Sequence, residues 1–206
     1  MTTDMNAEAR AERAELADLL ASLSDDQWQA PSLCSQWRVH DVAAHVIGYG
    51  ELTPMRFAYC RARGWSLARI NAADVARYLD ASPEQLVELI RARQQPVGLT
   101  AWFGGRVALA EAMIHHQDIR RPLGLARTIP PPRLRAALDF VRFAPLIRGA
   151  WRVRGLRLVA TDIDWAFGAG PEIRGTGEAL LMAMAARPAA LDDLTGPGHP
   201  RLARRI

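Results

Sequence analysis

The chain has 206 residues, enough for one medium-sized domain or for a main domain with a small appendage. Hydrophobic residues make up 50% of it, and the only cysteines are Cys34 and Cys60. This composition argues against a secreted disulfide scaffold and favours a reducing compartment. The net charge is +4 and no lysine occurs, but the arginines are interspersed with acidic residues, so we expect no specific nucleic-acid binding.

The N-terminal segment lacks the basic stretch followed by an apolar run that marks a signal peptide. No apolar stretch reaches the roughly 18 residues that a membrane span requires. The sequence therefore predicts a cytoplasmic protein that does not bind membranes, either a monomer or a homodimer.

Helical periodicity dominates the first two thirds of the chain. Residues 6–23 repeat leucine at helical spacing, and a second helix is expected from Val39, continuing towards Cys60 and ending near Gly64. Ser82 precedes Pro83, with Gln85 three residues after the serine, which is typical of a helix start.

Two more helices are expected further along, at 106–120 and at 133–141, the second after a run of three prolines. Beyond about residue 150 the pattern changes: residues 156–168 alternate in part and favour β structure, PEIRG predicts a second short strand, and TGEALLMAMAAR predicts a helix. We therefore predict a mainly α fold with two domains, a helical bundle at 1–147 and a small α/β domain at 148–206.

A group of metal-binding residue types falls on the predicted bundle helices. Glu111 and His115 are four residues apart, so both point to one side of their helix, one turn apart. Asp118 follows on the same face, and His45 lies at the edge of the apolar stripe of the second helix. Two helices could present His45, Glu111 and His115 inward as the ligands of one divalent ion, leaving a position open for substrate.

Less specific explanations exist for the same residues. A Glu–His pair at this spacing arises by chance on solvated helices, and a single histidine is commonly a partly buried residue with ordinary hydrogen bonds. The alanines Ala108 and Ala112 on the Glu111 face, however, indicate close helix packing, where a carboxylate needs a compensating charge. His116 points about 100° away from His115, and we expect it at the surface or outside the ligand set.

The segment WRVHDVAAH (residues 37–45) resembles the GW-x-V-x-D-V-x-x-H signature of the DinB-like helical-bundle superfamily, with Gln36 where that pattern has glycine. AEAMIHHQDIRRPLG (residues 110–124) resembles the matching fourth-helix signature in the form seen in the mycothiol-dependent maleylpyruvate isomerase family. Residues 156–196 look like the C-terminal domain of that family. The resemblance implies a DinB-like four-helix bundle with a small C-terminal α/β domain.

The resemblance also implies a function. His45, Glu111 and His115 match the family's metal ligands; the metal is usually zinc, while nickel, iron and manganese stay open. The family uses mycothiol, an actinobacterial thiol, whose metal-bound thiolate attacks a small electrophile in an isomerase or S-transferase reaction. Asp118 would orient His115 or a neighbouring backbone group. Arg187 best matches the family's C-terminal arginine and could hold a substrate carboxylate, although a cation at a helix C-terminus is an equal explanation.

Two other functions remain open at this point. The first is a non-catalytic, metal-binding stress protein on the same fold. The second is a small-molecule-binding module with a degenerate site. The sequence supports the thiol-dependent enzyme best, and it does not identify the electrophile.

Overall fold

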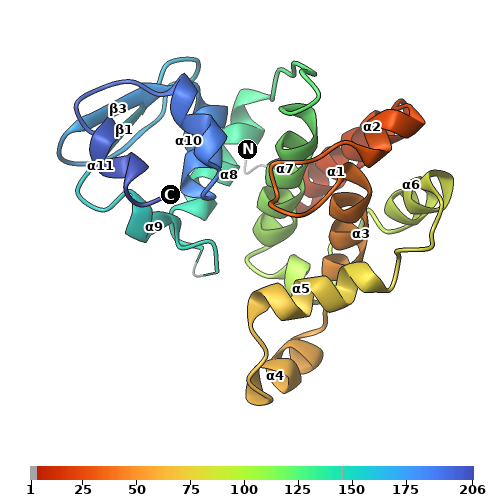
Figure 1. Ribbon diagram of the computed structural model, residues 1–206. Coiled ribbons are helices and arrows are strands. Elements are labelled where there is room, and N and C mark those ends of the chain that lie inside the picture. Colours follow the sequence, from red (N-terminus) through yellow and green to blue (C-terminus); the bar gives the residue numbers. More distant parts are fainter. Residues whose placement is uncertain (1–3, 145) are drawn as a thin grey trace. The chain divides into compact units, whose positions relative to one another are not determined.

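The computed structural model describes residues 4–144 and 146–206, which separate into two compact units, Met1–Ala126 and Arg127–Ile206 (Figure 1). Most of the elements are helices, and one small sheet lies in the second unit. The predictions of a mainly helical fold and of a small C-terminal α/β part are confirmed. No helix in these described ranges has both the length and the apolar character needed to cross a membrane.

Four helices of the first unit form a closed ring of contacts, in which α1 packs on α7, α7 on α3, α3 on α6 and α6 on α1. They span Met5–Ala21 (α1), Val39–Gly50 (α3), Pro83–Ala92 (α6) and Arg106–Arg120 (α7). This is the contact pattern of a four-helix bundle. Leucine, isoleucine and valine side chains from all four helices fill the centre, among them Leu16, Leu20, Val42, Val46, Leu86, Ile90 and Ile119.

The local signals explain where these helices begin. The Ser82 hydroxyl accepts a hydrogen bond from the Gln85 backbone N–H, and the Gln85 side chain accepts one from the Ser82 backbone, so the predicted start of α6 is confirmed. Helix α7 covers the predicted range 106–120. It follows Gly105, whose φ of 86° lies in the left-handed region that glycine adopts most easily.

One helix is shorter than expected. We predicted that the second helix continues towards Cys60, but α3 ends at Gly50 and a new helix, α4 (Pro54–Ala62), follows. Thr53 explains the break, because its hydroxyl caps α4 by accepting from the Arg56 backbone N–H, and Pro54 occupies the first helical position. The first unit is completed by α2 (Asp25–Gln29), α5 (Leu67–Ala76), which we did not predict, and the 3₁₀ turn η1 (Gly98–Ala101).

The second unit contains the sheet. Strand β1 (Arg157–Ala160) lies between β2 (Ala166–Gly168), which is antiparallel to it, and β3 (Glu172–Gly175), which is parallel. The predicted strand region thus divides into two strands, and PEIRG forms the third. The helices of this unit are α8 (Pro131–Val141), α9 (Gly149–Arg152), α10 (Gly177–Met184), the 3₁₀ helix η2 (Pro188–Asp193) and α11 (His199–Ala203).

The two units divide at a different residue from the domain boundary that we predicted. That boundary fell between residues 147 and 148, whereas the contacts divide the chain between Ala126 and Arg127. The reason is helix α8, which packs on α10. Its apolar face is therefore buried within the second unit, a choice of partner that periodicity alone does not specify.

Candidate metal centre

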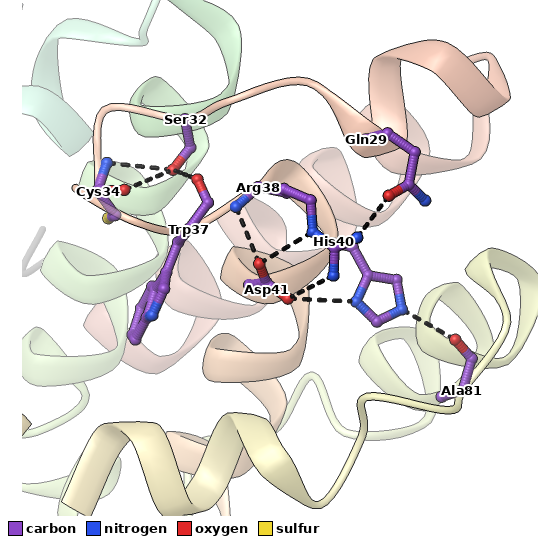
Figure 2. Close-up of polar contacts among 8 residues, drawn as sticks. All are labelled: Gln29, Ser32, Cys34, Trp37, Arg38, His40, Asp41 and Ala81. Atoms are coloured by element: carbon purple, nitrogen blue, oxygen red, sulfur yellow. Dashed lines mark hydrogen bonds and ion pairs between the residues drawn. The ribbon is translucent and has the colours of Figure 1, made fainter. Parts of the chain in front are cut away.

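Polar contacts on both sides fix the start of α3 (Figure 2). The Asp41 carboxylate accepts a hydrogen bond of 3.0 Å from the Arg38 backbone N–H, which closes the first turn of the helix. The His40 ring nitrogen Nε2 lies 2.9 Å from the Ala81 carbonyl oxygen. These contacts set the position of α3, and His45 follows His40 by five residues on the same helix.

His45 is buried against aromatic rings and against His115 of α7. Its ring centroid lies 4.9 Å from that of Trp37, in the loop before α3, and 5.7 Å from that of Tyr49, one turn later. The His115 ring stands nearly perpendicular to it, with 4.8 Å between the centroids. The adjacent helices α3 and α7 therefore bring the two histidines of the predicted site together (Figure 1).

Glu111 completes the predicted group. Three possible ligand atoms, one each from His45, Glu111 and His115, all lie within 4.8 Å of one another. Glu111 Oε1 is 4.0 Å from His115 Nε2. The Glu111 carboxylate is buried, and neither of its oxygens accepts a hydrogen bond from any part of the chain that the structure describes. Burial raises the pKa of Glu111, although the nearby charges of His115 and Arg13 oppose this effect.

A divalent cation fits this donor set. A buried carboxylate that accepts no hydrogen bond is costly unless a positive charge or a metal compensates it. Two imidazoles and one carboxylate are ligands that zinc and similar ions prefer, and three protein ligands leave a coordination position open.

The other side of His115 is closed by Asp118 and Cys34. Asp118 Oδ2 lies 2.9 Å from His115 Nδ1, and the Cys34 Sγ–H donates to the same oxygen over 3.1 Å. Burial by itself lowers the pKa of His115, but the contacts with Asp118 and Cys34 outweigh it and raise that pKa to about 10. Asp118 thus lies where a residue that orients His115 should lie.

Cys34, His115 and Asp118 form a second candidate group for a metal ion. Their atoms already make hydrogen-bond contacts with one another at 2.9 and 3.1 Å. The Glu111 carboxylate, in contrast, accepts no hydrogen bond from the described chain. An ion at the first group therefore satisfies a buried carboxylate, whereas an ion at the second replaces contacts that exist, so the first group is the better candidate.

Residues 9–120 match the family model of the mycothiol maleylpyruvate isomerase N-terminal domain, more than half of the chain. The chain belongs to this family. The matched range contains both helices of the candidate centre, α3 and α7. The predicted membership of an isomerase family is therefore confirmed.

Two solved structures share the fold along nearly the whole chain. One is a mycothiol-dependent maleylpyruvate isomerase in which a histidine is replaced by alanine; it is 18% identical, with a TM-score of 0.62 and 97% of each chain covered. The other is a structure of the mycothiol-dependent maleylpyruvate isomerase at 16% identity, with a TM-score of 0.56 and 97% of each chain covered. These two likenesses confirm the predicted fold. Comparison with curated protein sequences finds no significant match.

The family signature has glycine at the position of Gln36, and the backbone conformation at this position gives the reason. Gln36 adopts a φ of 71°, in the left-handed region that glycine adopts without steric cost. The chain keeps the turn despite the missing glycine, and Ser32 helps to hold it, because its hydroxyl donates to the Trp37 carbonyl over 2.9 Å (Figure 2).

The sequence interpretation missed three residues around the centre. Arg13 lies 3.7 Å from Glu111 Oε2, and Cys34 contacts Asp118. The third residue is Tyr49, whose pKa is raised to about 12 by burial and by the charge of Glu111. Arg13 could have been found from spacing, because it precedes the buried Leu16 and Leu20 by three and seven residues and so lies on their face of α1. Cys34 had no such signal.

Arg187 lies in the second unit, directly before η2. Its guanidinium donates to the Ala185 carbonyl over 2.7 Å, which is the contact of a cation at the end of a helix. Burial, followed by the charges of Arg148 and Arg187, lowers the pKa of Arg152, so Arg187 belongs to a group of neighbouring arginines. Such a group of positive charges also suits the binding of an anion.

Proposed function

We propose that this chain is a metal-dependent, mycothiol-using isomerase or S-transferase that acts on a small electrophile. The observation that carries the proposal is the convergence of His45, Glu111 and His115 on a buried carboxylate that accepts no hydrogen bond from the described chain. Family membership adds mycothiol as the thiol and maleylpyruvate as the first substrate to test.

A divalent ion in this position, with zinc the first candidate, would lower the pKa of a bound thiol and orient its sulfur. The chain's own residues prepare the site. Asp118 holds the Nδ1 side of His115, so that Nε2 faces Glu111. Trp37 covers one side of His45 and limits the access of water.

We propose Arg187 as the residue that holds a carboxylate of the substrate, through a bidentate pair with its guanidinium. The neighbouring positive charges of Arg148 and Arg152 support this role, since they favour an anion at the same place. Arg187→Ala should raise KM for a carboxylate substrate, whereas Arg174→Ala, which alters an exposed arginine of the same unit, should not.

Metal analysis tests the core of the proposal. Protein purified without a metal-binding tag should contain close to one equivalent of metal, and His45→Ala and His115→Ala should both lose it. His199→Ala is the matched control, because His199 contacts the Leu191 carbonyl in the second unit. Metal-loaded protein should then isomerise maleylpyruvate, or attach mycothiol to an electrophile, only when mycothiol is supplied. A wild-type protein that takes up no zinc on incubation would exclude this site.

A further inference from the structure

Glu111 reaches the candidate centre next to a guanidinium buried inside the bundle. Arg13 of α1 is 3% exposed, and its Nη2 lies 3.7 Å from Glu111 Oε2. The other carboxylate oxygen, Oε1, is the one that faces His115 Nε2. The two oxygens of Glu111 thus have different neighbours, a fixed cation and the candidate metal position.

The protein holds this guanidinium from two other helices. Nη1 donates to the Arg93 carbonyl at the end of α6 over 2.8 Å, and Nη2 lies 3.4 Å from the Val46 carbonyl of α3. Gly50, the last residue of α3, leaves the necessary space: a Cβ there would lie 3.1 Å from Nη2 and 3.3 Å from Nη1. Arg13 is therefore placed by its surroundings and not by Glu111 alone.

A distance of 3.7 Å makes the Arg13–Glu111 contact an ion pair without a hydrogen bond. Such a contact directs the carboxylate and compensates part of its charge, yet it leaves the oxygens able to bind a metal. A well-formed bidentate pair would hold both oxygens and compete with the metal.

We propose that Arg13 is a positioning residue for the metal centre, which holds Glu111 Oε2 and so directs Oε1 to the ion. This inference rests on the proposed function, since it takes Glu111 as a ligand. Arg13 itself touches neither metal nor substrate. Groups that orient a metal ligand from outside the ligand set contribute measurably to metal affinity, and their replacement typically weakens it about 10- to 100-fold.

The experiment compares zinc affinities, measured by competition with a chromogenic chelator, with thermal melting of the metal-free proteins. Arg13→Met removes the positive charge and the two donating nitrogens of the guanidinium, and it should weaken zinc binding about 10- to 100-fold. Arg13→Lys keeps a positive charge and should lie between this variant and the wild type. Arg10→Met is the matched control on the same helix, because Arg10 makes an exposed contact with Gln95, and it should bind zinc as the wild type does.

A second variant separates positioning from stability. Gly50→Ala keeps every charged group and replaces glycine by a better helix former, but its methyl group must displace the guanidinium by a few tenths of an ångström. It should bind zinc more weakly than the wild type, by a smaller factor than Arg13→Met, without a lower melting temperature.

Arg13→Met is expected to fold, because Arg13 borders a cavity of about 190 Å³ where water can take the place of the guanidinium at the two carbonyls. If it fails to fold, Arg13→Lys and Gly50→Ala decide the question. Wild-type affinity in the folded Arg13 variants, with only the melting temperature lowered, would overturn the inference while leaving the metal site intact. A wild-type protein that binds no zinc would instead exclude the metal site itself, and the inference with it.

Discussion

His115 and His116 are consecutive residues of α7, but their ring nitrogens have different partners. The described part of the chain engages both nitrogens of His116, whereas it engages only one nitrogen of His115 within hydrogen-bond distance. Both ring nitrogens of His116 meet protein groups: Nδ1 lies 3.0 Å from Glu12 Oε1, and Nε2 accepts from Arg120 Nε over 2.9 Å. His115 is engaged at Nδ1 by Asp118, whereas its Nε2 faces Glu111 Oε1 at 4.0 Å, beyond hydrogen-bond distance.

The comparison shows that burial alone does not distinguish a proposed metal ligand from a structural histidine. His116 is 0% exposed and His115 is 8% exposed, so His116, which we expected at the surface or outside the ligand set, is the more deeply buried of the two. The polar cluster of Glu12, His116 and Arg120 links α1 to α7, and both ring nitrogens of His116 take part in its contacts. The group at His115 contains a carboxylate whose interactions a metal would complete.

The strongest test of this difference replaces each of the two histidines by alanine in a separate variant. His115→Ala should reduce zinc binding below detection, since it removes a ligand. His116→Ala should keep zinc binding but lower the free energy of unfolding by about 3 kcal/mol, because it removes a contact of the buried Glu12 carboxylate. Zinc titration and urea unfolding of both variants measure these effects. Equal loss of zinc binding in the two variants would contradict the distinction.

Replacement of the group on the Nδ1 side of His115 should have the next largest effect. Asp118→Asn retains an acceptor for Nδ1 but removes the negative charge that makes the imidazole a stronger ligand, so zinc affinity should fall about 10- to 100-fold. The same chelator competition measures it. If Asp118→Asn binds zinc like the wild type, Asp118 serves only the packing of α7.

The pH dependence of metal binding sharpens the comparison further. With its pKa raised to about 10, His115 carries a proton at neutral pH in the metal-free protein, and a metal ion must displace that proton. Zinc affinity should therefore increase about tenfold per pH unit between pH 7 and pH 8. Calorimetry in two buffers with different ionisation enthalpies should show release of at least one proton on binding, whereas no proton release would contradict a protonated His115.

Protonation of His115 also affects the stability of the metal-free protein, but here a rise in pH lowers the stability, whereas it increases zinc affinity. A raised histidine pKa stabilises the folded state fully below the unfolded value of about 6.5, and this contribution is lost as the pH rises through about 10. Metal and proton thus compete for one nitrogen.

The smallest effect is expected at Cys34. Cys34→Ser keeps a hydrogen-bond donor near Asp118 Oδ2. Zinc affinity should therefore change less than about tenfold, which is less than the change expected for Asp118→Asn. Cys60→Ser, which alters a buried cysteine of α4, is the matched control and should leave zinc affinity unchanged. A loss at Cys34 as large as that of Asp118→Asn would place the thiol among the groups that hold the metal.

The sequence by itself determined the helices that carry the site and the residues that they bring together. The serine cap of α6, the limits of α7 and the four-residue spacing of Glu111 and His115 are local properties of the chain, and local hydrogen bonds and helical geometry are enough to specify them. The two helix signatures also identified the family, because they span both halves of the centre.

Only the tertiary structure decided which charged residues are buried. Spacing places Arg13 on the face of α1 that carries Leu16 and Leu20, but the burial of both Glu12 and Arg13 depends on the packing of α1 on α6 and on α7, which covers two of its faces. The boundary between the two units depended likewise on the partner of α8. Burial on a second face and the choice of a packing partner arise from contacts between residues far apart in the chain, which the periodicity of one segment does not encode.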